Sequence, residues 1–86
     1  MNNNDLNIEL YKLIANWNPM NFDDPTLGDA EVYEVMDQVH QLGEPDKIAH
    51  EIQNIYQFSF ETTIPYERCK AIADQAVALK SSCKVN

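Results

Sequence analysis

The sequence predicts an all-α fold, a compact four-helix bundle formed as a single domain over residues 1–86. Apolar residues recur every three or four positions in four successive blocks, which is the spacing of one helix face. The chain has only two glycines and four prolines, too few for a protein of many strands and turns. Short links between the blocks favour antiparallel packing of neighbouring helices.

The first helix is predicted over residues 5–17, where Asn4 or Asp5 can accept hydrogen bonds from the free amides at its start. Proline disfavours helical geometry in the residue before it, so the Asn18-Pro19 pair ends this helix. Its buried side is expected to consist of Leu6, Leu10, Leu13, Ile14 and Trp17.

A loop at 18–28 separates the first helix from the second. Three of its side chains are expected to fold back over the core: Met20, Phe22 and Leu27. The second helix is predicted over residues 29–42, with Asp29 as N-cap and Gly43 just past its end. Its buried stripe is Val32, Val35, Met36, Val39 and Leu42.

The third helix is predicted over residues 45–61, with Pro45 in its first position. Its apolar stripe is Ile48, Ala49, Ile52, Ile55, Tyr56 and Phe60. Phe58 falls off this stripe. Residues 56–60 also alternate like a strand, but a lone strand would leave its backbone groups without partners, so a helix is predicted.

The fourth helix is predicted over residues 65–81 and opens at Pro65. Its apolar side is Cys69, Ile72, Ala73, Ala76, Val77 and Leu79. Residues 82–86 are predicted to be a frayed tail. Cys69 and Cys83 would lie about 21 Å apart on one helix, too far for a disulfide bond.

The charge of the chain is strongly negative, with 14 acidic and six basic residues and a net charge of −8. Eight acids and no base lie between Pro19 and Asp46. This field repels phosphate backbones and anionic membranes, so we expect binding of neither nucleic acid nor membrane. The first residues lack the cationic and apolar parts of a secretory signal, which predicts a cytoplasmic location.

Several segments together resemble a known family. They are Trp17-Asn18-Pro19, an acidic second helix ending in Val39-His40, and the stretch from Ile52 to Glu61 (IQNIYQFSFE) followed by Ile64-Pro65. In these residues the chain is similar, over about residues 6–80, to the YugE-like proteins. These are small uncharacterised proteins of bacillus-type bacteria. The resemblance implies an all-helical fold and a bacterial cytoplasm, and it transfers no activity and no functional residue.

Part of the sequence imitates a calcium-binding loop. Asp23, Gly28 and Glu34 occupy the first, sixth and twelfth places of the EF-hand pattern. Pro25 and Leu27 stand where oxygen ligands should be, so calcium binding is not predicted.

The soft metal ligands of the chain are His40, His50, Cys69 and Cys83, all at least ten residues apart. Zinc sites usually contain a closely spaced ligand pair, so neither a metal nor a cofactor is predicted. No glycine-rich phosphate loop or nucleophile elbow is present, and we expect no enzymatic activity. The alternative is a small-ligand or catalytic site between helices near Cys69 and His50.

The block of acids has two interpretations. It can be a solvated face that keeps a monomer, or a weak homodimer, in solution. It can also be a docking surface for a basic protein, since complementary charge speeds encounter and selects partners. For the second interpretation, the candidate residues, here called the acidic surface, are Asp23, Asp24, Glu31, Glu34 and Asp37. An aromatic side chain exposed beside these acids, such as Phe58 or Tyr66, would be a candidate anchor.

Overall fold

The computed structural model describes residues 3–82, and helices account for most of them. The elements in order are α1 (Asn3–Trp17), the 3₁₀ helix η1 (Pro25–Gly28), α2 (Asp29–Gln41), α3 (Pro45–Phe60) and α4 (Tyr66–Ser82). No strand occurs within residues 3–82, so the all-α prediction is confirmed. Each α-helix lies within two residues of its predicted bounds, whereas η1 was not predicted. A frayed tail was predicted over residues 82–86, but Ser82 is the last residue of α4. The rest of the predicted tail, residues 83–86 with Cys83, lies outside the described residues.

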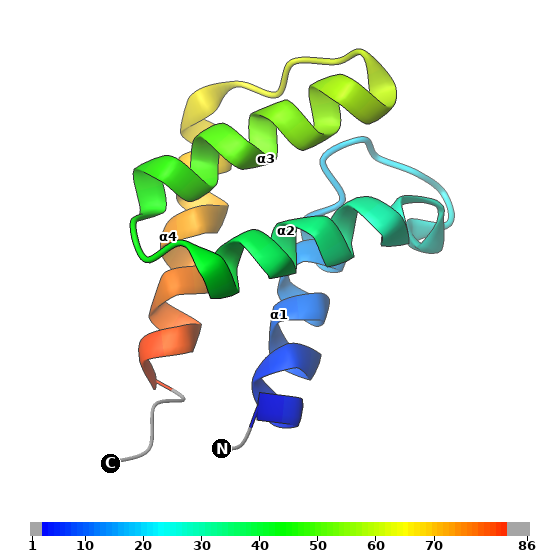
Figure 1. Cartoon of the computed structure of the whole chain (residues 1–86). Helices are drawn as coiled ribbons and strands as arrows, with labels where there is room; N and C mark the ends of the chain where they lie inside the picture. Colours follow the sequence, from blue (N-terminus) through cyan, green and yellow to red (C-terminus); the bar gives the residue numbers. More distant parts are fainter. Residues whose placement is uncertain (1–2, 83–86) are drawn as a thin grey trace.

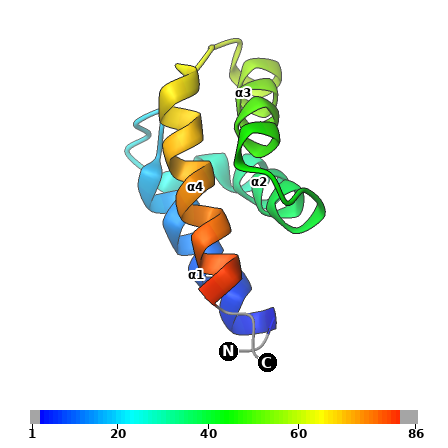
Figure 2. The same ribbon diagram turned by 90° about the vertical axis from the view of Figure 1, so that its left-hand side faces the viewer.

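The helices form two antiparallel pairs that cross each other (Figures 1 and 2). One pair is α1 with α4, and the other is the hairpin of α2 with α3. Contacts of α3 with α4 and of α2 with α1 join the two pairs. Within the described chain, no helix has the length and apolar character that crossing a membrane requires.

The core lies where the two pairs cross and takes residues from all four predicted stripes. Its buried members are Leu6, Leu10, Ile14, Val32, Val35, Met36, Val39, Ile48, Ala49, Ile52, Tyr56, Ile64, Cys69, Ile72, Ala73 and Ala76. Tyr56 packs edge-on against Trp17, with ring centroids 6.0 Å apart, and stacks on Phe60 at 5.8 Å. No polar or charged residue of the described chain is buried, so the core is held mainly by apolar packing.

Two predicted N-caps are wrong. Gly28 occupies the N-cap position of α2, and Asp29 is its first helical residue. The Asp29 carboxylate accepts a 2.6 Å hydrogen bond from the Tyr11 hydroxyl, so a contact between helices replaces the local cap. The predicted N-cap of the first helix was Asn4 or Asp5. Because α1 already begins at Asn3, both residues lie inside its first turn.

The loop before η1 is closed by Asn18. Its backbone is left-handed, with φ of 40°. Its side-chain amide donates a hydrogen bond to the Phe22 carbonyl and accepts one from the Phe22 N–H. Phe22 thereby turns inward against Phe60, at a centroid distance of 5.4 Å, and Met20 packs on the core. The prediction that Leu27 also covers the core is wrong, because η1 leaves this side chain 65% exposed.

We predict that Asn18→Ala lowers the free energy of unfolding by about 1.5–3 kcal/mol, because alanine loses both side-chain hydrogen bonds and tolerates left-handed geometry poorly. Asn21→Ala is the matched control, since Asn21 is also left-handed, with φ of 56°, but is exposed. It should cost about 1 kcal/mol. Urea denaturation measures both variants, and equal losses would contradict a bracing role for the Asn18 side chain.

The stretch around Phe58 is helical throughout, as predicted. The last turn of α3 is closed by the Glu61 amide, which donates to the Gln57 carbonyl at 2.9 Å. Glu61 then stops the helix by adopting left-handed geometry, with φ of 53°. Phe58 is therefore held on a regular helix although its ring is 89% exposed.

Candidate functional site

The acidic surface lies partly on the outer side of α2. The stripe centred on Val32 and Val35 faces the core, so the helical period turns Glu34 and Asp37 outward, and both are exposed. Glu31 lies about a quarter turn around the helix from Val32 and is half-buried. Its negative charge, together with the larger effect of burial, raises the pKa of Tyr56 on α3 to about 12. Glu31 therefore lies on the flank of α2 that faces α3.

The other two members, Asp23 and Asp24, are exposed in the loop before η1. The Asp24 carbonyl accepts the Leu27 amide at 3.1 Å and so starts the 3₁₀ turn. Asp37 lies eight residues beyond the first residue of α2, about 12 Å along the helix. The structure thus arranges the predicted residues as a strip along α2 and its preceding loop, and not as one tight cluster.

Charges on this strip have few partners. Asp23, Glu31 and Glu34 form no ion pair within residues 3–82. Asp37 accepts a hydrogen bond only from the neutral amide of Gln41, at 2.9 Å. The ion pairs of the described chain lie elsewhere: Lys12–Glu9, Lys47–Glu44, Lys70–Asp46 and Lys70–Asp74. Within residues 3–82, the charges of Asp23, Glu31 and Glu34 are consequently not neutralised by an ion pair.

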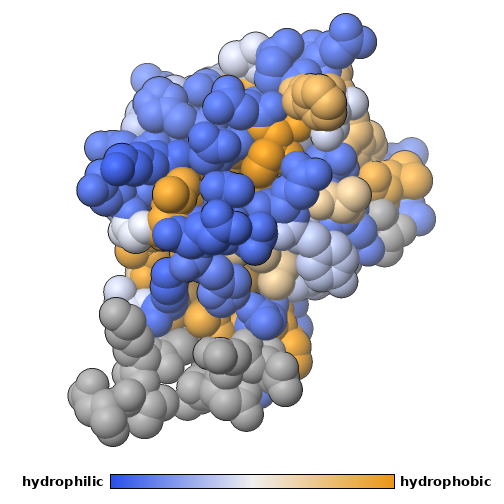
Figure 3. All heavy atoms as spheres, in the orientation of Figure 1, coloured by the Kyte–Doolittle hydropathy of each residue, from blue (hydrophilic) through white to orange (hydrophobic). Residues whose placement is uncertain are grey.

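The face over α2 and α3 combines this charge with one exposed aromatic ring. In Figure 3 it is hydrophilic over most of its area, with hydrophobic side chains in separate patches. Phe58 is the most exposed large apolar residue of the described chain, at 89%, and was flagged because it left the α3 stripe. Tyr33 on α2, 58% exposed, was missed, and it lies on the flank of α2 toward α1, where its ring packs on Tyr11 at a centroid distance of 5.7 Å. Tyr33 directly follows Val32 and falls outside the apolar stripe of α2, and this pattern could have identified it from the sequence.

Cys69 and His50 do not form the alternative site predicted for them. Cys69 is fully buried, and its thiol points to the carbonyl of Ile64 at 3.9 Å. Burial raises the pKa of this thiol to about 11, although the charge of Arg68 opposes the shift. His50 is exposed and packs on the ring of Tyr66, with centroids 5.0 Å apart. A reactive cysteine needs an accessible thiolate, and Cys69 is a protonated core thiol at neutral pH.

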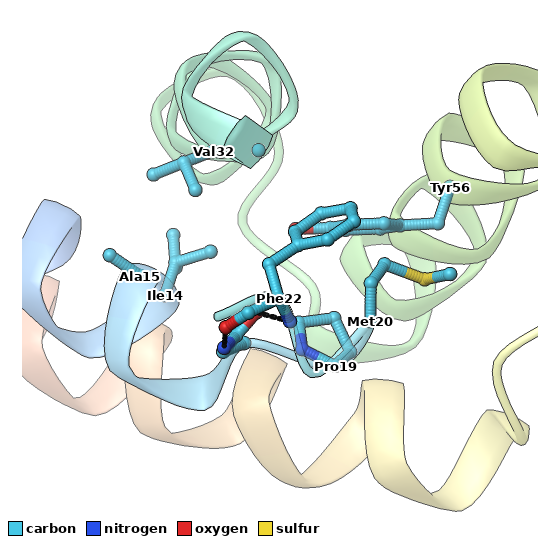
Figure 4. Close-up of a pocket in the computed structure, with 9 residues that line it drawn as sticks. Ile14, Ala15, Pro19, Met20, Phe22, Val32 and Tyr56 are labelled. Carbon is cyan, nitrogen blue, oxygen red and sulfur yellow. Dashed lines mark hydrogen bonds between the residues drawn. The ribbon is translucent and has the colours of Figure 1, made fainter. Parts of the chain in front are cut away.

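The cavity enclosed beneath the loop is too small for a ligand. It has a volume of about 10 Å³, roughly the space of one water molecule. Figure 4 shows Ile14, Val32 and Tyr56 converging on it from three helices, with the ring of Phe22 and the side chain of Met20 closing it from the loop. This cavity is a small packing defect of the core.

A larger hollow lies between α1 and α4. This open groove has a volume of about 410 Å³. It is lined by Glu9, Lys12, Leu13, Asn16, Gln75, Ala78 and Leu79. Neither Cys69 nor His50 lines it, so any small-molecule site here would differ from the one that the sequence suggested.

The metal-binding patterns are not assembled in the described part of the chain. Residues 25–28 form η1 and Glu34 lies inside α2, so the segment from Asp23 to Glu34 does not fold as a calcium loop. His40 is exposed and its ring nitrogen Nε2 lies 2.7 Å from Oδ1 of Asn7. Across residues 3–82, no three His, Cys, Asp or Glu side chains converge as metal ligands would.

Fold and surface together define a small, acidic, all-α protein of two crossed helix pairs. Its sequence from residue 9 to residue 86 matches the family described as "Domain of unknown function (DUF1871)", and the chain belongs to this family. The resemblance to YugE-like proteins is thereby confirmed.

Two relatives support this assignment. The chain is 34% identical over 74 residues to the "Uncharacterized protein YugE" of Bacillus subtilis (strain 168), covering 86% of this chain and 85% of that protein. A crystal structure of a protein from Bacillus stearothermophilus superposes with a TM-score of 0.88 at 29% identity. That match covers 93% of this chain and 98% of the other, so the two share the same helical fold. The function of the family is unknown.

Proposed function

We propose that this protein is a non-enzymatic interaction module of the bacterial cytoplasm that binds a basic protein through its acidic surface. The observation that carries the proposal is the charge of the strip along α2. Asp23, Glu31 and Glu34 have no ion pair within the described residues, and the segment from Pro19 to Asp46 contains no lysine or arginine. An unneutralised field of one sign attracts an oppositely charged partner and repels anionic ones.

The chemistry of the interior supports a binding role over a catalytic one. The one cysteine of the described chain is a buried, protonated thiol, and the cavity beside Tyr56 holds no more than a water molecule. The outer-face carboxylates of Glu34 and Asp37 are exposed on a helix surface, where they can reach the cations of a partner.

Small-ligand binding is the second candidate function, and the groove between α1 and α4 favours it. Its volume of about 410 Å³ is within the range of small-molecule sites, and Leu13 and Leu79 supply apolar surface. A ligand seated there would leave the acidic surface free, so the two candidates predict different effects of mutation.

The test is charge reversal with affinity capture. We predict that the combined variant Glu31→Lys, Glu34→Lys and Asp37→Lys loses basic proteins that the unaltered chain captures from a bacillus lysate, because it removes the field of α2. The control variant carries the same change of net charge on α1 and α4, at Glu9, Glu67 and Asp74, and should retain at least half of the capture. Rising salt should weaken capture by the unaltered chain.

Quantitative mass spectrometry of the captured proteins provides the readout, with circular dichroism to show that both variants fold. Equal capture by the α2 variant and the unaltered chain would refute the proposal. So would equal losses in the α2 variant and its control, because the position of the acids would then be irrelevant.

A further inference from the structure

The exposure of Phe58 is not explained by the fold. Tyr56, two residues earlier on the same helix, is 2% exposed, whereas Phe58 is 89% exposed. A Phe ring left in water forgoes the stabilisation that burial of its apolar surface would give. The turn that carries Phe58 is closed by the hydrogen bond from Glu61 to Gln57, so fraying does not account for its position.

Phe58 lies away from α4. The flank of α3 that meets α4 is identified by three contacts: Tyr66 bonds Asp46, the His50 ring packs on Tyr66, and Gln53 donates to the Ile64 carbonyl at 2.7 Å. By the helical period, Phe58 lies about a quarter turn from this flank, in line with Ile55 and Glu51 at spacings of three and seven residues. This row lies on the side of α3 that is turned away from α4.

Acids surround this exposed ring. On its own helix, Glu51 precedes Phe58 by two turns and Glu61 follows it by one. The neighbouring helix α2 packs against α3 and carries the half-buried Glu31 and the exposed Glu34 and Asp37. The chain has no lysine or arginine from residue 48 to residue 67, nor from residue 13 to residue 46. The α2–α3 face therefore presents an apolar anchor inside a negative field.

We infer that the α2–α3 face docks a basic amphipathic helix of the partner protein, with Phe58 covered by its apolar stripe and the flanking acids paired with its lysines or arginines. This inference rests on the proposed function and names its partner class. A helix offers an apolar row edged by cations, which is the complement of this face. A basic segment without apolar side chains would satisfy the acids and leave Phe58 in water. A second copy of this chain would bring like charges together, at −8 each.

The experiment uses two synthetic 18-residue peptides with identical lysine positions. One is a Leu/Lys peptide with leucine at helical spacing, and the other has serine in place of every leucine. Fluorescence anisotropy measures the dissociation constant of each peptide for the full chain and for three variants. These are Phe58→Ala, the control Ile8→Ala on α1, where Ile8 is 52% exposed, and the combined α2 variant of Glu31, Glu34 and Asp37 to lysine.

We expect Phe58→Ala to weaken binding of the Leu/Lys peptide about tenfold and Ile8→Ala to change it less than twofold. The Ser/Lys peptide should bind the chain and Phe58→Ala equally. Unchanged affinity of Phe58→Ala for the Leu/Lys peptide overturns the inference, as does failure of that peptide to bind the unaltered chain.

The same measurements separate this inference from the proposed function. If the α2 variant loses both peptides while Phe58→Ala loses neither, the acidic surface binds cations without an apolar anchor, and only the inference fails. If the α2 variant binds both peptides as the unaltered chain does, the proposed function fails.

Discussion

Replacing Tyr56 by alanine is expected to lower the free energy of unfolding by about 3–5 kcal/mol. The ring is the largest fully buried side chain of the core and contacts Trp17 and Phe60. It also lines the small cavity under the loop, so its removal enlarges an existing void. Typical domains are stable by about 5–15 kcal/mol, so this loss would remove a large part of the stability of a chain of 86 residues.

The matched control is Phe58→Ala, an aromatic truncation two residues away on the same helix. Since Phe58 is exposed, its replacement should change stability by no more than about 0.5 kcal/mol. Urea denaturation followed by circular dichroism measures both variants. A loss at Phe58 as large as that at Tyr56 would mean that Phe58 is part of the core, and it would also remove the basis for a docking role.

Stability should fall as the pH rises from about 9 to about 11. The Cys69 thiol has an ordinary pKa of 9.0, and burial raises its pKa to about 11 in the folded chain. Between these values the unfolded chain loses a proton that the folded chain keeps, so each increase in pH favours unfolding. A rise of two pKa units corresponds to about 2–3 kcal/mol of stability, fully present below pH 9 and lost above pH 11. Burial also raises the pKa of Tyr56 to about 12, so its titration extends the fall in stability to higher pH.

Chemical denaturation at pH 8, 9, 10 and 11 tests this dependence. Cys69→Ala is the control, because it removes the titrating thiol while Tyr56 still titrates at higher pH. It should be less stable at pH 8, owing to the small cavity it creates, and should decline less between pH 9 and 11. Parallel curves for the two proteins would show that Cys69 is not the group responsible.

Most of the fold could be predicted from the sequence because its helices are strongly periodic. Val32, Val35 and Val39 share one face of the helix wherever its exact ends are placed, and all three are buried. Residues 56–60 were predicted as helix from the argument that a lone strand cannot satisfy its backbone, and the structure agrees.

The features that could not be predicted from the sequence depend on contacts between elements. Asp29 was predicted as a cap from its local position, but the hydroxyl of Tyr11 on another helix takes its carboxylate. Leu27 was expected to be buried because it is apolar, yet the geometry of η1 turns it to solvent. The crossing of the two helix pairs and the groove between α1 and α4 likewise follow from packing that periodicity does not encode.

The acidic surface was predictable as a set of charges and not as a shape. Counting acids and bases located it, and the helical period turned Glu34 and Asp37 outward as expected. The position of Glu31 toward α3 needed the structure, because a sequence does not say which helix lies on which flank.

Amide hydrogen exchange of the chain with and without a captured basic partner tests the central claim most directly. If the partner docks on the acidic surface, exchange should slow in α2 and in the second half of α3, with α1 and the second half of α4 unchanged. Protection confined to residues around the groove between α1 and α4, with α2 exchanging as in the free chain, would contradict the account.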